Sequence, residues 1–160
     1  MRPIAPSGSP DPARRREKSR EAILNATREL IIIGGWENLT IEGIAKRAGA
    51  GKQTIYRWWP TKGAVVFEAF LGDQMGGPFD LPDTGHLEDD LQMILRDTVT
   101  EFNDPAFDGI MRALLAEVQS DTALETDLKR RLLEPQRVAT VRRFESAKEA
   151  GQLDPELDPE

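Results

Sequence analysis

The sequence contains no cysteine and a single histidine, His86, among its 160 residues. Without cysteine there is no disulfide framework, no thiolate nucleophile and no cysteine-ligated metal site. A reducing compartment inside the cell, the cytoplasm, is the simplest interpretation of this composition. No apolar run reaches the ~18 residues that a membrane span needs, and residues 1–12 lack the apolar block of a signal peptide. We therefore expect no membrane association, no metal and no cofactor.

The net charge of −7 comes from 21 Lys+Arg against 28 Asp+Glu, but the charge is unevenly distributed. Residues 1–62 hold 12 basic and 6 acidic side chains, a balance of +6, whereas residues 63–160 hold 9 and 22, a balance of −13. This asymmetry indicates two parts with different partners. A compact basic segment is typical of phosphate binding, although basic side chains can also simply solvate a helix face.

The N-terminal residues combine a polar tail with the start of a helix. Residues 1–12 include four prolines, two serines and a glycine, so we expect residues 1–15 to form a disordered tail. The basic run 14–16 is either an arm that touches DNA or a solvated start to the first helix. Apolar spacing then predicts a helix over residues 17–33, ended by Gly34 and Gly35.

Two short helices follow this longer one. Thr40 is the expected N-cap of a helix over residues 41–48, and Gly49-Ala50-Gly51 ends it. The next helix covers residues 52–58 and stops before Pro60, because the residue before a proline avoids the helical region. Two short helices joined by a tight glycine-containing turn are typical of a helix-turn-helix.

The second short helix is the expected DNA-reading element. It offers donors for phosphates, an amide for base edges and aromatic rings to pack beside the sugar-phosphate chain. Its candidate contacts are Lys52, Gln53, Thr54, Tyr56, Arg57 and Trp58. Arg57 either pairs with guanine or stays solvated, and Trp59 is expected in the core, leaving Trp58 to contact the backbone. Glu42 either stabilises its helix dipole or accepts a hydrogen bond from a cytosine amino group.

Helical spacing without strand-like alternation continues through the rest of the chain, so we predict an all-α fold. Thr61 is expected to cap a fourth helix. Three further helices follow, over residues 87–102, 107–118 and 121–150, the last kinked at Pro135 and closed by Gly151. We divide the chain into a helix-turn-helix domain at residues 16–62 and a helical ligand-binding and dimerisation domain at residues 63–160.

The acidic domain holds several apolar side chains that line a ligand pocket or belong to the ordinary core. They are Phe67, Phe70, Met75, Phe79, Met93, Phe102, Phe107 and Met111. His86 precedes a helix and is expected to be exposed rather than a ligand or base. The run Glu88-Asp89-Asp90 is expected to be a solvated first turn, favoured by the helix dipole, although it could bind a cationic effector.

Two segments resemble the TetR family of transcriptional regulators. Thr40-Ile41-Glu42-Gly43-Ile44-Ala45-Lys46-Arg47-Ala48-Gly49 is similar to the second helix of that family. Lys52-Gln53-Thr54-Ile55-Tyr56-Arg57-Trp58-Trp59-Pro60-Thr61-Lys62 is similar to its recognition helix and the entry to its fourth helix. The similarity covers residues 18–70, and the part after residue 84 resembles one subgroup of the family, including Leu-Glu-Pro at 133–135.

The resemblance implies a homodimeric repressor. Two recognition helices would enter successive major grooves of a palindromic double-stranded DNA operator, and a small-molecule effector in the C-terminal half would release the DNA. Tyr56 and Lys62 match phosphate contacts of the family, and Thr40 matches the helix cap that faces the phosphate chain. Gln53, Thr54 and Arg57 lie at or beside positions that contact bases.

The sequence departs from the family pattern at its acidic end, residues 153–160. Family members usually continue into two more helices that form the dimer interface, and these are missing from this chain. A second hypothesis is therefore a TetR-like module that binds an effector or a protein without an operator. A third, an all-helical enzyme, has little support, because no phosphate loop, nucleophile elbow or metal-binding histidine pair is present.

Overall fold

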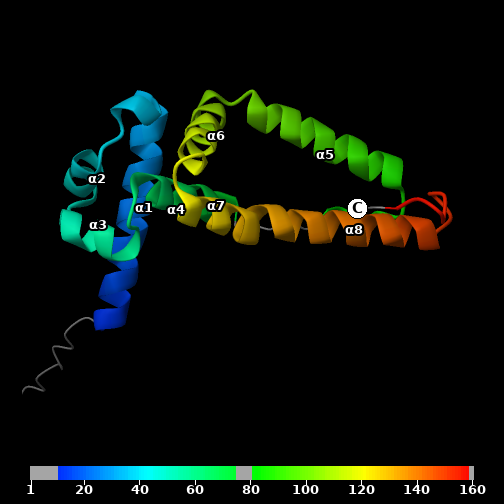
Figure 1. Cartoon of the computed structure of the whole chain (residues 1–160), viewed down its shortest axis with the longest axis horizontal. Helices are drawn as coiled ribbons and strands as arrows, with labels where there is room; N and C mark the ends of the chain where they lie inside the picture. The colour runs from blue at the N-terminus through cyan, green and yellow to red at the C-terminus, as the bar shows by residue number, and fades with distance from the viewer. Residues whose placement is uncertain (1–10, 75–80, 159–160) are drawn as a thin grey trace, which may run out of the picture.

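The computed structural model of the chain describes residues 11–74 and 81–158 (Figure 1). Within these ranges the chain is helical and contains no strand, which confirms the all-α prediction. The helices are α1 (Pro12–Asn38), α2 (Ile41–Ala48), α3 (Lys52–Trp58), α4 (Lys62–Gln74), α5 (Leu87–Phe102), α6 (Pro105–Val118), α7 (Thr122–Leu128), the π-helix η1 (Lys129–Leu133) and α8 (Glu134–Glu149). We call α1 to α3 the head and α4 to α8 the body.

The first helix begins earlier than its apolar pattern predicts. Asp11 is the N-cap and accepts a hydrogen bond from the backbone N–H of Ala13 at 3.0 Å, and Pro12 occupies the first turn. Proline suits that position because its fixed φ is helical and its missing N–H would have no partner there. Residues 12–15, which we expected in the tail, therefore belong to α1, and the basic run 14–16 lies within its first turns. Residues 1–10 lie outside the described part.

The end of α1 is interrupted at Gly35, as the glycine pair predicts. Gly35 has φ 68° and ψ 177°, a conformation that only glycine adopts readily, although helical hydrogen bonding resumes as far as Asn38. Leu39 then donates its backbone N–H to the carbonyl of Trp36 at 3.1 Å and buries its side chain. The bend returns the chain towards α2.

The helix-turn-helix has the predicted caps. Thr40 accepts the N–H of Gly43 at 3.0 Å, and Gly49 ends α2 in the left-handed conformation with φ 63°. Ile44 and Ile55 are fully buried, and each contributes about 1.5–3 kcal/mol of hydrophobic stabilisation. These contacts hold α3 against α2 and leave most of its remaining surface to solvent.

The head and the body share one hydrophobic core. Thr61 caps α4 by accepting the N–H of Ala64 at 3.1 Å, and Val65, Val66 and Phe67 of α4 are almost completely buried. The same cluster continues into α6, α7 and η1, and α1 packs against α2, α4 and α6. The domain boundary that we place at residues 62 and 63 falls at the start of α4, beside this shared core.

The last predicted helix is continuous but changes its winding before Pro135. Because proline has no N–H, the regular bond to the carbonyl four residues earlier cannot form. Lys129–Leu133, which end two residues before this proline, adopt the wider π-helix η1, a local change that is common at functional sites. Leu124, Leu128 and Leu132 are all buried on one face, as their spacing predicts.

The apolar stripe of α5 is much more exposed than its spacing suggests. Leu95, Val99 and Phe102 expose more than half of their surface, and Val138 on α8 does so too. In Figure 1, α5 and α8 extend away from the head, and α5 packs mainly against α6. Among the described helices, none is both long enough and apolar enough to cross a membrane.

Candidate nucleic-acid interface

Helix α3 buries one side chain, Ile55, and presents the others outward to different degrees. Lys52, Gln53 and Arg57 are exposed, and Tyr56 exposes 51% of its surface. Thr54 is half-buried. A large aromatic ring and three polar side chains therefore lie on the solvent side of this short helix. This face is available to an external partner.

The two residues at the start of α2 that we predict to contact DNA, Thr40 and Glu42, form hydrogen bonds within the free chain. The hydroxyl of Thr40 caps α2, and its residue lies exposed at the N-terminal end of that helix. Glu42 accepts a hydrogen bond from the ammonium of Lys52 at 2.7 Å, which joins α2 to α3. This bond lowers the pKa of Glu42 and raises that of Lys52, so both remain charged near neutral pH. Glu42 thus holds Lys52 at the surface that α3 presents.

The two adjacent tryptophans divide as we expected. Trp59 is 6% exposed and belongs to the core, whereas Trp58 is half-buried. Their rings meet edge to face with centroids 5.5 Å apart. The guanidinium carbon of Arg57 lies 5.6 Å from the ring centroid of Trp58, within the range of a cation–π contact. Trp58 therefore supports the side chain that we expect to contact bases.

Lys62, at the first position of α4, lies against the end of α1. Its ammonium is 3.9 Å from the ring centroid of Trp36 and donates to the carbonyl oxygen of the same residue at 3.4 Å. We expected Lys62 to contact a phosphate and Trp36 to face the core, and we did not predict that the two would pair. Lysine is common and cation–π partners have no fixed spacing, so no pattern in the sequence indicated this pair.

The predicted pocket residues within the described ranges differ widely in burial. Phe67 and Phe70 are buried, and Phe107 packs on both Phe70 and Phe102 with centroids 5.7 and 5.1 Å apart. Met93 and Phe102 expose 47% and 53% of their surface in the single chain. Met111 is half-buried against the core, and Met75 and Phe79 lie outside the described residues.

The clefts among the described residues have charged side chains in their walls. One, of about 300 Å³, separates the end of α3 from α7, and Phe67 is the pocket candidate that lines it. Glu68 lines this cleft and forms ion pairs with Arg20 of α1 and with Arg131 of η1, the latter at 2.7 Å. This bridge joins the head to the body, and we did not predict it from the sequence.

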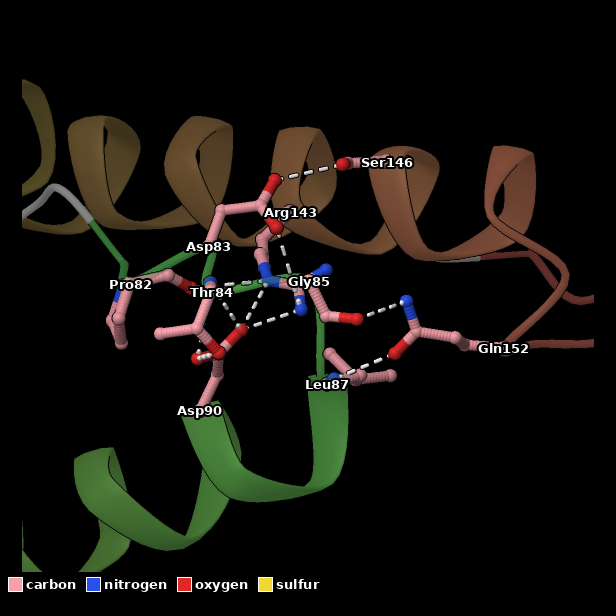
Figure 2. Close-up of polar contacts among 9 residues, drawn as sticks. All are labelled: Pro82, Asp83, Thr84, Gly85, Leu87, Asp90, Arg143, Ser146 and Gln152. Carbon is pink, nitrogen blue, oxygen red and sulfur yellow. Dashed lines mark hydrogen bonds and ion pairs between the residues drawn. The ribbon is translucent and has the colours of Figure 1, made fainter.

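A buried ion pair anchors the segment before α5 to α8 (Figure 2). Arg143 donates to the carboxylate of Asp90 from Nε at 3.0 Å and from Nη2 at 2.5 Å. Asp90 also accepts from the backbone and hydroxyl of Thr84, and Arg143 Nε donates to the carbonyl of Pro82 at 3.0 Å. Gln152 completes the anchor by accepting the N–H of Leu87 at 2.7 Å.

Asp90 corrects the expectation of a solvated first turn. Glu88 and Asp89 are exposed as predicted, but Asp90 has no exposed surface and Arg143 is 3% exposed. Burial opposes the charged carboxylate, yet hydrogen bonds from Arg143 and Thr84 outweigh it and lower the pKa of Asp90 below its usual value. The charge run carried no sign of this, because the partner lies 53 residues away. His86 is exposed, as expected.

Comparison with known proteins identifies the family. The family model for bacterial regulatory proteins of the TetR family matches residues 23–69, and the model for a tetracyclin repressor-like C-terminal domain matches residues 81–160. The HTH-type transcriptional regulator YdeS of Bacillus subtilis is 30% identical over 91% of this chain and 73% of its own length. The chain belongs to the TetR family of transcriptional regulators.

Other relatives agree with this assignment. The HTH-type transcriptional regulator Rv1556 of Mycobacterium tuberculosis is 30% identical over 82% of this TetR-family chain, which spans 63% of that relative's length. The crystal structure of the TetR family transcription regulator SCO0332 superposes with a TM-score of 0.71 at 30% identity, over 89% of this chain and 78% of that one. Family members are ligand-responsive transcriptional regulators. The match to the family's N-terminal model includes the helix-turn-helix, and the match to the C-terminal model includes α5 to α8 of the body.

Proposed function

We propose that this TetR-family chain represses transcription as a homodimer that binds a palindromic operator through α3 and releases it when an effector binds the body. The outer face of α3 is the observation that carries the proposal. It presents Gln53, Tyr56 and Arg57, while Ile55 is buried and Trp58 packs partly against the core. Such a face matches the major groove, where amide and guanidinium groups distinguish bases.

Phosphate contacts would position this face on the duplex. Tyr56 carries an exposed hydroxyl on α3, and Lys62 supplies an ammonium at the start of α4. Thr40 lies at the N-terminal end of α2, where unpaired backbone N–H groups and the helix dipole favour an anion. The basic balance of residues 1–62 draws this side of the chain to DNA, and the acidic balance of residues 63–160 turns the body away from it.

The body provides a structural route for an effector to act on the head. Helix α4 continues directly from the helix-turn-helix into the shared core, and Glu68 on this helix is paired to both Arg20 and Arg131. A ligand that shifts η1 or α4 would therefore displace the head. We assign no catalytic role to the chain.

The test measures how tightly the chain binds DNA from upstream of its own gene. Fluorescence anisotropy gives the affinity at each of several salt concentrations. Affinity should fall steeply with salt through counterion release. Tyr56→Phe should weaken binding to all sequences alike, whereas Arg57→Ala should cost about 1–3 kcal/mol on the preferred sequence and relax specificity.

Arg142→Ala is the matched control for Arg57→Ala, because Arg142 is an exposed arginine of α8 on the body. It should leave affinity and specificity unchanged. Absence of any complex with the wild-type chain at low salt would remove the proposal. Equal losses in Arg57→Ala and Arg142→Ala would show that α3 is not the reading element.

A further inference from the structure

Each of the three tryptophans carries a basic side chain on its ring. Arg57 lies on Trp58 and Arg20 on Trp59, with guanidinium carbons 5.6 and 6.0 Å from the ring centroids. Lys62 on Trp36 is the closest contact, at 3.9 Å. It joins residues that are 26 positions apart, at the end of α1 and the start of α4. A contact this short lies well within the range in which the ring quadrupole attracts an ammonium.

The backbone holds Trp36 in one place. Gly35, with its positive φ, redirects the chain immediately before Trp36. The carbonyl of Trp36 accepts the N–H of Leu39 at 3.1 Å. The same carbonyl accepts from Lys62 at 3.4 Å, so ring and carbonyl hold the ammonium together. Trp36 itself is half-buried and packs against the core cluster. The site that receives Lys62 is therefore already formed in the free chain.

A fixed ammonium binds a phosphate at lower entropic cost than a free one. Lysine has a long stem with many rotamers, and freezing them opposes binding. An ammonium has three N–H donors, so its bond to one carbonyl leaves donors for an incoming phosphate oxygen. An aromatic face attracts the cation but offers it no competing negative charge, unlike a carboxylate partner.

We infer that Trp36 is a positioning residue for DNA binding, which acts by holding the ammonium of Lys62 ready for the phosphate backbone. The inference rests on the proposed function, because Lys62 must contact DNA for its position to matter. Trp36 itself needs no contact with the duplex. Its effect is independent of sequence, since phosphates carry no base information.

The experiment compares Trp36→Leu and Trp36→Phe in the wild-type and Lys62→Ala backgrounds. The probe is a mixed-sequence DNA duplex at low salt, read by fluorescence anisotropy, so no operator needs to be known. Trp36→Leu should weaken binding about two- to fivefold in the wild-type background. Trp36→Phe, which keeps an aromatic face, should lose less. In the Lys62→Ala background, Trp36→Leu should cause no further loss.

A second readout requires no DNA. The ε-methylene protons of Lys62 should show an upfield ring-current shift in the NMR spectrum of the wild-type chain, and Trp36→Leu should abolish it. Equal losses in both backgrounds would show that Trp36 acts only through folding and would overturn the inference. An unshifted ε-methylene signal in the wild type, or full affinity in Trp36→Leu, would overturn it as well. If the wild type binds no duplex, the proposed function itself fails, which is distinct from binding with additive losses.

Discussion

A buried ion pair between Asp90 and Arg143 joins two helices of the body. Asp90 has no exposed surface and is balanced by Arg143, with Thr84 supplying two further donors. Breaking a buried pair by removing one charge is costly, because the other charge remains buried without compensation. This group of residues fixes the start of α5 to the end of α8, and hence the far end of the body.

Asp90→Asn should therefore lower the melting temperature at neutral pH by about 5–10 °C. Because the folded pKa of Asp90 lies below the usual 3.8, its carboxylate stabilises the fold above that pH, and this contribution is lost as the pH falls through the folded value. The difference in melting temperature between wild type and variant should shrink below pH ~4. Circular dichroism melts across pH measure both effects.

Asp89→Asn is the control for this change, since Asp89 is the exposed neighbour on the same turn. Its melting temperature should stay close to that of the wild type at every pH. If Asp90→Asn melted with the wild type at pH 7, the ion pair would have no stabilising role.

The boundaries of several helices could be predicted from residues close to them in the sequence. Capping by Thr40 and Thr61, the stop at Gly49 and the interruption at Gly35 were all predictable, because caps and left-handed glycines depend on residues within one turn. The start of α1 at Pro12 also obeys a local rule, but the proline-rich composition of the tail obscured it.

Contacts between distant residues were not predictable in the same way. Arg143 and Asp90 lie on different helices, as do Lys62 and Trp36, and each pair is far apart in the sequence. A single sequence carries periodicity and caps, whereas ion pairs and cation–π contacts have no fixed spacing. The α3 surface was predictable because its contacts lie in one short segment. The walls of a cavity come from several helices, so the pocket candidates Met93 and Phe102 stay predictions, and both are about half exposed in the single chain.

Gly35→Ala should destabilise the fold by about 1–3 kcal/mol, because an alanine strains at φ 68° and ψ 177° although no atom lies within 4 Å of its Cβ. Gly109→Ala is the matched control: Gly109 lies inside α6 and its Cβ would also meet nothing within 4 Å. That change should be neutral or stabilise the helix by up to ~1 kcal/mol. Urea unfolding of both variants measures the difference, and equal effects would contradict the strain at Gly35.

At the scale of the whole molecule, the net charge of −7 conceals opposite halves. The +6 balance belongs to residues 1–62, which include the head with its polar, exposed outer helix α3, and the −13 balance belongs to residues 63–160, which include most of the body. The two share a hydrophobic core through α4 and are also joined through Glu68. Because of this connection, a change in the conformation of the body can alter the position of the DNA-facing surface of the head.

Selection of bound duplexes from a random DNA library tests the central claim most directly, since it assumes neither an operator nor an effector. The account predicts an enriched inverted repeat whose half-sites lie about 10 base pairs apart, one helical turn, with the preference at the contacted bases relaxed by Arg57→Ala. A selected pool no different from the starting library, obtained at low salt with the folded wild-type chain, would contradict it.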